Sequence, residues 1–252
     1  MNVALLTAAG SGTRMNQDIP KQFIHVDNKP VIIYTMEAFQ NHPSIDAIIV
    51  VTLESWSAVL WAYAKQFNIT KLKWVIPGGE TGQESIFKGL DKLKEELSDE
   101  DVVLIHDGNR PLVSSQIISD SLATFSRYGS AVAAIPCTEV VFETDDGVSS
   151  CVSTERERLL RTQTPHTYKL GDLHGAHLEA QKRGITTTAA SCMLMKELGR
   201  MTYFSKGSEE NLKITTTDDL KIFKALLNMK HLSQVWTKPQ RPFWSFRKKA
   251  FL

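Results

Sequence analysis

A loop rich in small residues near the N-terminus is the part of this sequence best suited to chemistry. It reads Ala8-Ala9-Gly10-Ser11-Gly12-Thr13-Arg14-Met15 and is followed by Pro20-Lys21-Gln22-Phe23. Small side chains let backbone N–H groups approach an anion, and Arg14 and Lys21 add two positive charges. The spacing differs from a Walker A loop and from the Rossmann fingerprint, which needs a third glycine. We therefore expect a phosphate-binding loop, with a tight strand-to-helix turn as the alternative.

An aspartate stands directly after the apolar run from Val102 to Ile105, in the sequence His106-Asp107-Gly108-Asn109-Arg110-Pro111. An acidic residue at the end of a buried parallel strand lies in the ligand crevice, where it can hold Mg²⁺ that bridges phosphates. We therefore predict Asp107 as a metal ligand. The alternative is that Asp107 caps the next element or pairs with Arg110. We interpret His106 as a packed or hydrogen-bonded scaffold residue rather than a catalyst.

Three further segments offer contacts to a nucleotide or a phosphate. Residues 78–85 read Gly-Gly-Glu-Thr-Gly-Gln-Glu-Ser; their glycines can admit a flat base, although alone the segment is only a loop with a helix N-cap. Lys213 lies in a short extended segment before the last helix and can reach a phosphate as a point charge. Arg156, just past a predicted hairpin, is ambiguous by itself. These segments together favour a phosphate site over an isolated tight turn.

Strand-like and helix-like segments alternate along the chain and must position these residues. The expected strands are residues 3–6, 47–51, 72–76 and 102–105, with a short strand near Tyr203; the expected helices are 30–39, 56–67, 84–97, 170–183, 189–198 and 217–229. This alternation predicts an α/β fold with a doubly wound, mostly parallel sheet and helices on both faces. In such sheets the ligand crevice lies beyond the carboxyl ends of the strands, where the first loop must lie.

A predicted β-hairpin interrupts the alternation at about residues 137–160. Two β-prone runs, 139–144 and 148–154, flank Asp145-Asp146-Gly147, which is a strong hairpin signal. A hairpin inserted into a doubly wound domain projects from it as an arm, and such arms often meet a second subunit. We therefore expect a projecting dimerisation arm.

The last residues differ in composition from the rest of the chain. We divide the sequence into a domain over residues 1–230 and a basic, aromatic C-terminal tail over residues 231–252, which has no acidic residue. The expectation is a partly ordered tail that packs on the domain or on a partner. Contact with a membrane surface or a polyanion is the alternative.

The bulk composition is that of a globular protein with a real core. The 252 residues are 42% hydrophobic and 23% charged, with a formal net charge of +1, which argues against a dedicated nucleic-acid binder. Cys137, Cys151 and Cys192 have no CxxC spacing, so we expect reduced thiols rather than a zinc site. The sequence shows neither a signal peptide nor a membrane span, and a cytoplasmic location is expected.

Taken together, the motifs resemble the cytidylyltransferases that activate polyol phosphates. That family includes 2-C-methyl-D-erythritol 4-phosphate cytidylyltransferase of isoprenoid synthesis and ribitol-5-phosphate cytidylyltransferase of teichoic acid and capsule synthesis. The matching segments are the glycine-rich loop with Pro20-Lys21-Gln22, Gly78-Gly79 with Ser85, His106-Asp107-x-x-Arg110-Pro111, Gln163-Thr164-Pro165 and Asn211-x-Lys213-Ile214-Thr215. They occur in family order over residues 1–230.

The resemblance implies a Rossmann-like, nucleotide-diphospho-sugar transferase-like fold. It also implies transfer of CMP from CTP to a polyol phosphate, with Mg²⁺, to give a CDP-alditol and pyrophosphate. The implied catalytic residues are Arg14, Lys21 and Lys213, with Asp107 as the metal ligand. Arg156 would bind the polyol phosphate in the neighbouring subunit, so a homodimer is expected. The residues expected around CTP are Ala8, Ala9, Gly10, Gly79, Glu80 and Ser85.

Three positions depart from the family pattern. Gly82 stands where relatives commonly carry arginine, Val140 where a threonine contacts the second substrate, and Ala189 where an aspartate is expected. These changes leave the acceptor open, although segments 163–165 and 211–216 favour the ribitol-phosphate type slightly. Two alternatives remain: a nucleotidyltransferase for another NTP and sugar phosphate, and a non-catalytic relative that acts as a binding or assembly module.

Overall fold

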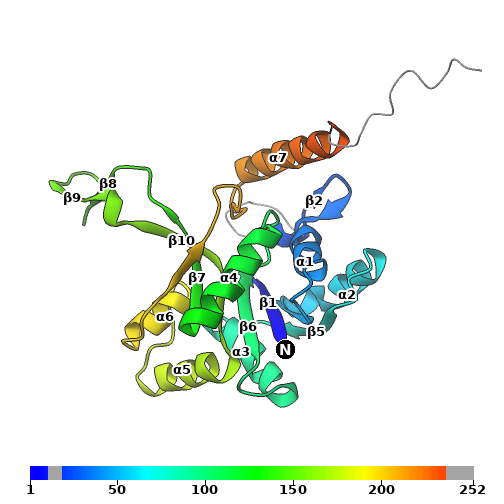
Figure 1. The fold of residues 1–252 in the computed structure, drawn as a ribbon, viewed down its shortest axis with the longest axis horizontal. Coiled ribbons are helices and arrows are strands. Elements are labelled where there is room, and N and C mark those ends of the chain that lie inside the picture. Colours follow the sequence, from blue (N-terminus) through cyan, green and yellow to red (C-terminus); the bar gives the residue numbers. More distant parts are fainter. Residues whose placement is uncertain (11–18, 237–252) are drawn as a thin grey trace, which may run out of the picture.

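A seven-stranded sheet forms the centre of the computed structural model, which describes residues 1–10 and 19–236 (Figure 1). The strands follow the order β11-β7-β10-β6-β1-β4-β5. Only β10 runs antiparallel to its neighbours β6 and β7 among the paired strands of this sheet. The predicted doubly wound, mostly parallel sheet is therefore confirmed. Its strands are β1 (Asn2–Ala8), β4 (Ala47–Thr52), β5 (Leu72–Pro77), β6 (Val102–Asp107), β7 (Ser130–Pro136), β10 (Leu160–Lys169) and β11 (Phe204–Lys206).

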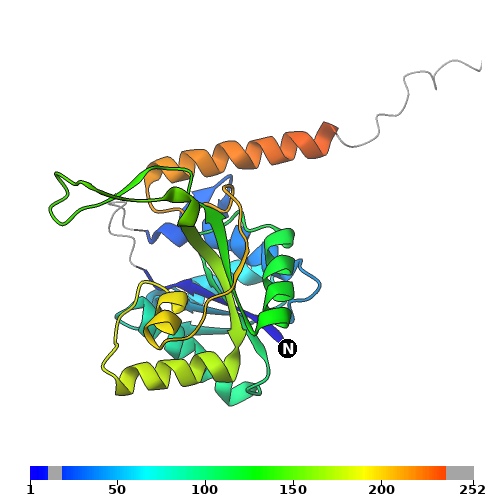
Figure 2. The same cartoon turned by 60° about the vertical axis from the view of Figure 1, so that its left-hand side comes forward.

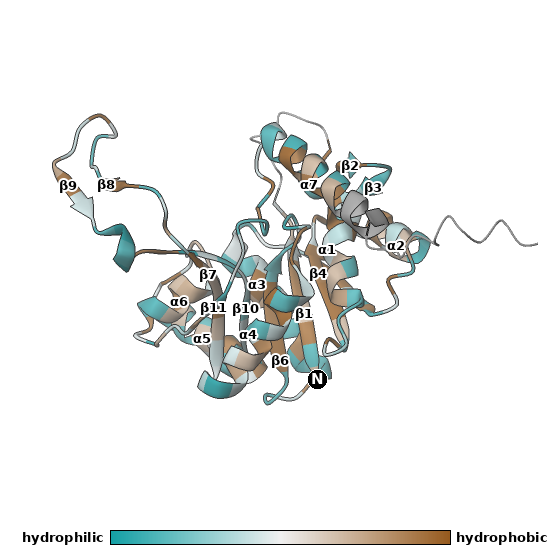
Figure 3. Cartoon of the chain, turned by 45° about the horizontal axis from the view of Figure 1, so that its top comes forward, coloured by the Kyte–Doolittle hydropathy of each residue, from teal (hydrophilic) through white to brown (hydrophobic). Residues whose placement is uncertain are grey.

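Helices cover both faces of the sheet because its inner strands are apolar on both sides (Figure 3). Along β1, Ala4 and Leu6 pack into one core, and Val3 and Leu5 pack into the other. The first core is closed by α1 (Val31–Gln40), α2 (Ser57–Gln66) and α4 (Ser115–Tyr128). The second is closed by α3 (Gly82–Glu96), α5 (Leu170–Lys182) and α6 (Ser191–Glu197).

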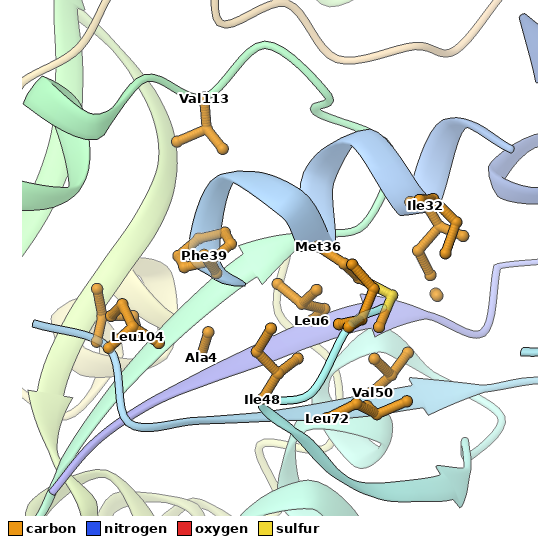
Figure 4. Packing of buried hydrophobic residues seen from close by; sticks show 14 of the residues in the cluster. Ala4, Leu6, Ile32, Met36, Phe39, Ile48, Val50, Leu72, Leu104 and Val113 are labelled. Atoms are coloured by element: carbon orange, nitrogen blue, oxygen red, sulfur yellow. The ribbon is translucent and has the colours of Figure 1, made fainter. Parts of the chain in front are cut away.

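The first core shows how a helix is fixed to the sheet. Ile32, Met36 and Phe39 of α1 are fully buried and point towards β1 and β4 (Figure 4). Their spacing of four and three residues places them on one face of the helix. Each such side chain contributes about 1.5–3 kcal/mol by leaving water. Helix α1 is therefore packed tightly against the strands whose carboxyl ends form the crevice.

Several elements differ from the prediction. Helix α4 and strands β7 and β10 were not predicted, although Ser114 caps α4 by accepting from Ile117 N at 3.2 Å and Gly129 ends it at φ 81°. The last helix, α7 (Thr217–Trp236), continues past residue 229. It therefore takes in the first residues of the predicted tail, while residues 237–252 lie outside the described part of the chain. A small ladder joins β2 (His25–Val26) to β3 (Lys29–Pro30).

A two-stranded hairpin lies where the Asp-Asp-Gly signal predicts one. β8 (Val141–Glu143) pairs with β9 (Val152–Thr154), and the 3-10 turn η4 (Arg156–Arg158) follows. The strands are shorter than predicted because Asp146 Oδ1 accepts hydrogen bonds from Val148 N at 2.8 Å and Ser149 N at 3.0 Å, which folds these residues into the turn. The hairpin projects from the body as an arm at the end of the sheet opposite the N-terminus (Figures 1 and 2).

Over residues 1–10 and 19–236, no helix is long and apolar enough to cross a bilayer.

Candidate active site

Two hollows meet where β1 and β6 end. These strands are parallel neighbours, and Thr7 lies opposite Asp107 in their register. The smaller hollow, of about 230 Å³, and the larger one, of about 520 Å³, share a wall made of Thr7, Gly82, Asp107 and Lys213. The crevice predicted at the carboxyl ends of the strands is therefore present, and it has two compartments.

The smaller hollow, which we call the donor pocket, gathers most of the residues predicted for CTP and catalysis. Segments that lie far apart in the sequence supply its walls. Arg14 falls on residues 11–18, outside the described part of the chain, and Arg156 is not in this wall. The predicted residues that line the donor pocket are Ala8, Ala9, Gly10, Lys21, Gly79, Glu80, Ser85, Asp107 and Lys213.

Gln22 holds the start of the glycine-rich loop. Its side chain is buried, and its Nε2 donates to the carbonyl of Ala8 and, at 3.3 Å, to that of Gly10. These bonds fix the direction of two peptide units at the mouth of the pocket. The sequence motif includes Gln22, but we assigned it no role. An amide directly after Lys21, in a segment predicted to bind phosphate, is the signal that could have revealed it.

The loop from Gly78 to Ser85 is locked against the glycine-rich loop. A Cβ at Gly78 would lie 2.3 Å from Ala9 Cβ, so only glycine permits this approach. Ser85 Oγ accepts from Gly79 N at 3.0 Å, while Thr81 caps α3 by accepting from Glu84 N at 3.1 Å. Ser85 therefore shapes the loop as well as lining the pocket.

Asp107 lies between two cations at the shared wall. Its Oδ1 is 2.9 Å from Lys213 Nζ, and its Oδ2 is 2.9 Å from Arg110 Nε. Burial by itself raises the pKa of Asp107, but Lys213 and Arg110 outweigh burial and hold that pKa well below its usual range. Asp107 therefore pairs with Arg110, which was the alternative to a metal-binding role. The same residue also lines both hollows.

A hydrogen-bonded frame holds this ion cluster in place. Arg110 Nη1 donates to the carbonyl of Asn211 at 2.7 Å, and Asn211 Nδ2 donates to the carbonyl of Thr164 at 2.9 Å. The backbone N–H of Asp107 in turn donates to Thr164 Oγ1 at 3.1 Å. Ile214, next to Lys213, is joined to Asn109 through its N–H at 2.9 Å. Sequence reasoning gave no role to Thr164, Asn109 or Asn211.

Asp107 could hold a metal only with help from a ligand. In the described part of the chain, no three His, Cys, Asp or Glu side chains cluster as a metal site. Magnesium in nucleotide sites commonly takes one or two carboxylates and completes its shell with phosphates and water. A single partly exposed carboxylate beside an anion pocket fits that pattern.

His106 has the surroundings of a scaffold residue, as predicted. Its ring is fully buried, packs on Phe39 at 5.1 Å between ring centroids, and places Nε2 at 3.3 Å from the carbonyl of Arg110. Burial lowers the pKa of His106 to about 3. It is therefore neutral at physiological pH and supports the loop that carries Arg110.

The three positions that depart from the family pattern, and Arg156, lie in different places. Gly82 and Ala189 line the larger hollow, which we call the acceptor pocket. Val140 is 73% exposed at the base of the arm. Arg156 is in the arm, where its Nε pairs with Glu157 Oε1 at 3.0 Å, and it lines neither pocket of its own chain.

Comparison with known proteins gives a consistent match over most of the chain. The profile of the family described as IspD, 2-C-methyl-D-erythritol 4-phosphate cytidylyltransferase, matches residues 2–229. The ribitol-5-phosphate cytidylyltransferase of Lacticaseibacillus paracasei is 42% identical over 234 residues, which cover 92% of this chain and 100% of that protein. The 2-C-methyl-D-erythritol 4-phosphate cytidylyltransferase of Clostridium acetobutylicum is 37% identical over 229 residues, which cover 90% and 97%.

The fold also matches a solved structure. The 4-diphosphocytidyl-2C-methyl-D-erythritol synthase of Anaerococcus prevotii superposes with a TM-score of 0.76 over 90% of this chain and 96% of that one. The two sequences are 23% identical, so this likeness concerns the fold alone.

Proposed function

The chain belongs to the IspD family of cytidylyltransferases, and we propose that it transfers CMP from CTP to a polyol phosphate of the ribitol 5-phosphate type. The family resemblance in the motifs is confirmed, and so is the predicted class of enzyme. The choice of acceptor follows the relatives. A ribitol-5-phosphate cytidylyltransferase is 42% identical to this chain, against 37% for a 2-C-methyl-D-erythritol 4-phosphate enzyme.

The observation that carries the proposal is the wall shared by the two pockets. A donor nucleotide in one pocket and an acceptor phosphate in the other would meet at Lys213 and Asp107. There a phosphate oxygen of the acceptor forms a bond to the α-phosphorus of CTP. The bond from that phosphorus to the bridging oxygen of the β-phosphate breaks, and pyrophosphate leaves. The residues contribute alignment and charge neutralisation, without a covalent intermediate.

Positive charge at the donor pocket fits this chemistry. Lys21 lines the pocket beside Ala8 and Gly10, and Lys213 stands at its boundary. We assign Lys21 and Arg14 to the triphosphate, and Lys213 to the phosphates that react. Mg²⁺ would be held by Asp107 and the triphosphate, and its charge would offset that of the leaving pyrophosphate.

We also propose a homodimer in which the arm of one subunit completes the acceptor site of the other. Val140, Phe142, Val148 and Val152 of the arm are between 52% and 89% exposed. Apolar side chains gathered on a thin projection favour a protein partner. Arg156 would then reach the acceptor phosphate in the partner's pocket. The free thiols and the soluble substrates are consistent with a cytoplasmic enzyme.

A screen for pyrophosphate release tests the function. The purified protein would be assayed with each of the four NTPs against ribitol 5-phosphate, 2-C-methyl-D-erythritol 4-phosphate and a sugar 1-phosphate. We expect release only with CTP and a polyol phosphate, fastest with ribitol 5-phosphate. Strict use of UTP or GTP would contradict the cytidylyl assignment, and binding of CTP without turnover would favour the binding-module alternative.

A further inference from the structure

Two unpartnered polar atoms are buried in the wall of the acceptor pocket. Within residues 1–10 and 19–236, His177 Nε2 and Ser191 Oγ are among the few buried side-chain atoms that lack a hydrogen-bond partner. His177 on α5 is 2% exposed, and Ser191 at the start of α6 is 3% exposed. Both residues line the acceptor pocket. A buried polar atom without a partner is costly, so each such atom calls for an explanation.

Neighbouring polar groups of the same pocket are already satisfied. Gln83 uses both ends of its amide: Nε2 donates to the carbonyl of Ile185 at 2.8 Å, and Oε1 accepts from Thr188 Oγ1 at 3.0 Å. His106 Nδ1 also lacks a partner, but its ring packs on Phe39 in the core on the opposite face of the sheet. Among the described residues on the sheet face that carries the acceptor pocket, the buried polar atoms without a partner that line this pocket are therefore those of His177 and Ser191.

His177 is held in a fixed orientation. Its ring stacks on Phe87, with 5.6 Å between centroids and 16° between planes. His174 stacks on Phe87 as well, at 5.4 Å, and its Nε2 is anchored by Asp91 Oδ1 at 2.7 Å. Because burial lowers the pKa of His177 to about 4, the imidazole is neutral at physiological pH and can donate or accept a hydrogen bond.

The chemistry of this part of the pocket selects a neutral, hydroxylated group. Ile86, Ile105 and Leu194 form the apolar part of the wall. A carboxylate or phosphate would lose its hydration there without a balancing cation, since the two cations that line the acceptor pocket, Arg110 and Lys213, are both paired with Asp107 at the wall shared with the donor pocket. Hydroxyl groups fit, because each one can both donate and accept and each carries an apolar carbon.

We propose that His177 and Ser191 bind the hydroxyl groups of the acceptor that lie farthest from its phosphate, and so select polyol phosphates by chain length. This inference rests on the proposed function, which puts the reacting phosphate beside Lys213. The remainder of the acceptor must then extend away from the donor pocket, towards α5 and α6. A five-carbon polyol reaches further in that direction than glycerol 3-phosphate does.

The test compares His177→Phe and Ser191→Ala with the control His25→Phe. The control makes the same change at an exposed position that lines neither pocket. For the polyol phosphate that the wild type uses best, each pocket variant should raise KM about tenfold, the size expected for one buried hydrogen bond. In the pocket variants the KM for CTP should stay within about twofold of the wild-type value. In the control, the KM for CTP and the KM for the polyol phosphate should both stay within about twofold.

Glycerol 3-phosphate, used as a competitive inhibitor, separates recognition from a structural role. Its inhibition constant should change little in either pocket variant, because it lacks the far hydroxyl groups that we assign to His177 and Ser191. If the KM for the polyol phosphate and the inhibition constant of glycerol 3-phosphate rose together, the substitution would have distorted the whole pocket, and the inference would be overturned. His177→Gln, which keeps a hydrogen-bonding group near Nε2, should restore most of the loss.

Other outcomes also decide the matter. Unchanged KM values in folded variants would overturn the inference and indicate that resident water satisfies these atoms. A rise in the KM for CTP alone would assign the pocket to the nucleotide. If His177→Phe does not fold, Ser191→Ala, which removes one oxygen atom, decides alone. Absence of any CTP-dependent turnover in the wild type would instead refute the proposed function itself.

Discussion

Asp107 and Lys213 form an ion pair of 2.9 Å although 106 residues separate them in the sequence. The pair lies on the wall between the donor and acceptor pockets, so it occupies the place where the reacting groups would meet. In the absence of substrate, the carboxylate satisfies the lysine. Under the proposed function, an entering phosphate would give the ammonium a second anionic partner, while the frame of Asn211 and Thr164 would keep the carboxylate in position.

Replacing Lys213 by alanine should reduce turnover without unfolding the protein. The ammonium is partly exposed, with 42% of its side chain accessible, so its loss creates no large cavity. A charge that stabilises the transition state typically contributes a factor of about 10² or more to kcat. Steady-state kinetics with thermal denaturation would measure both effects, and Lys206→Ala on the edge strand β11 is the matched control. Turnover of Lys213→Ala close to the wild-type value would remove the proposed mechanism.

Asp107→Asn should change the dependence on magnesium. The amide keeps the size of the side chain but removes the charge that attracts a divalent cation, so half-maximal activity should need about tenfold more Mg²⁺. Titration of activity with Mg²⁺ at saturating CTP measures this shift. If only kcat fell and the Mg²⁺ requirement stayed the same, Asp107 would act through Lys213 and Arg110 rather than through a metal.

Much of the fold could be predicted because its inner strands are short apolar runs between amphipathic helices. The inner parallel strands β1, β4 and β6 are of this kind, and the edge strand β5 was predicted as well. The antiparallel strand β10 escaped prediction because its first three residues, Leu160 to Thr162, are not buried and its second half contains His166 and Thr167. Because these residues are polar, the sequence pattern did not indicate a strand, although tertiary packing places β10 between β7 and β6.

The sequence places most of the residues that line the donor pocket, because they follow strands or lie in glycine-rich loops. Gln22, Thr164 and Asn211 were harder to interpret, since they act on backbone atoms of distant segments. His177 and Ser191 lie inside ordinary helices and carry no motif. Only the three-dimensional packing of α5 and α6 shows that their polar atoms are buried without partners.

Gly78→Ala should weaken CTP binding by separating the two loops of the donor pocket. The added Cβ would meet Ala9 Cβ at 2.3 Å and Ser85 Oγ at 3.0 Å, so one loop must move. We expect the KM for CTP to rise about tenfold and the free energy of unfolding to fall by about 1–3 kcal/mol. Gly175→Ala on α5 is the control, because its Cβ meets nothing within 4 Å and alanine favours the helix. A normal KM for CTP would show that the loops are free to part.

Two buried histidines should make the protein less stable in mild acid. Burial lowers the pKa of His166 and of His177 to about 4, from 6.5. Above pH 6.5 both are neutral in either state; as pH falls below that value, only the unfolded chain takes up their protons. Each histidine therefore reduces the free energy of unfolding by about 1 kcal/mol per pH unit until its folded pKa is reached.

Urea denaturation at several pH values between about 7.5 and about 5 measures this slope. His166→Asn should flatten it by the contribution of one histidine, whereas Gln181→Asn, which removes no titratable group at an exposed position, should leave it unchanged. A slope that is the same in all three proteins would mean that His166 is hydrated or charged in the folded state.

Arg156→Ala and Lys213→Ala should complement each other if the arm acts on the partner subunit. Each variant alone carries one defect in every site, so both homodimers should have low activity. A mixed dimer combines an intact Lys213 in one subunit with an intact Arg156 on the arm of the other, which restores one of its two sites. The isolated mixed dimer should therefore have about half of the wild-type activity, and an unfractionated random mixture, in which about half of the dimers are mixed, about a quarter.

Co-expression of the two variants with different affinity tags would isolate the mixed dimer. The matched control replaces Arg156→Ala with Arg183→Ala on α5, where the guanidinium pairs with Glu179 of the same helix. That variant should be active by itself and should gain nothing from mixing. If the mixed dimer of Arg156→Ala and Lys213→Ala were as inactive as its parents, Arg156 would have to act within its own chain, which would require the arm to fold back onto its own acceptor pocket.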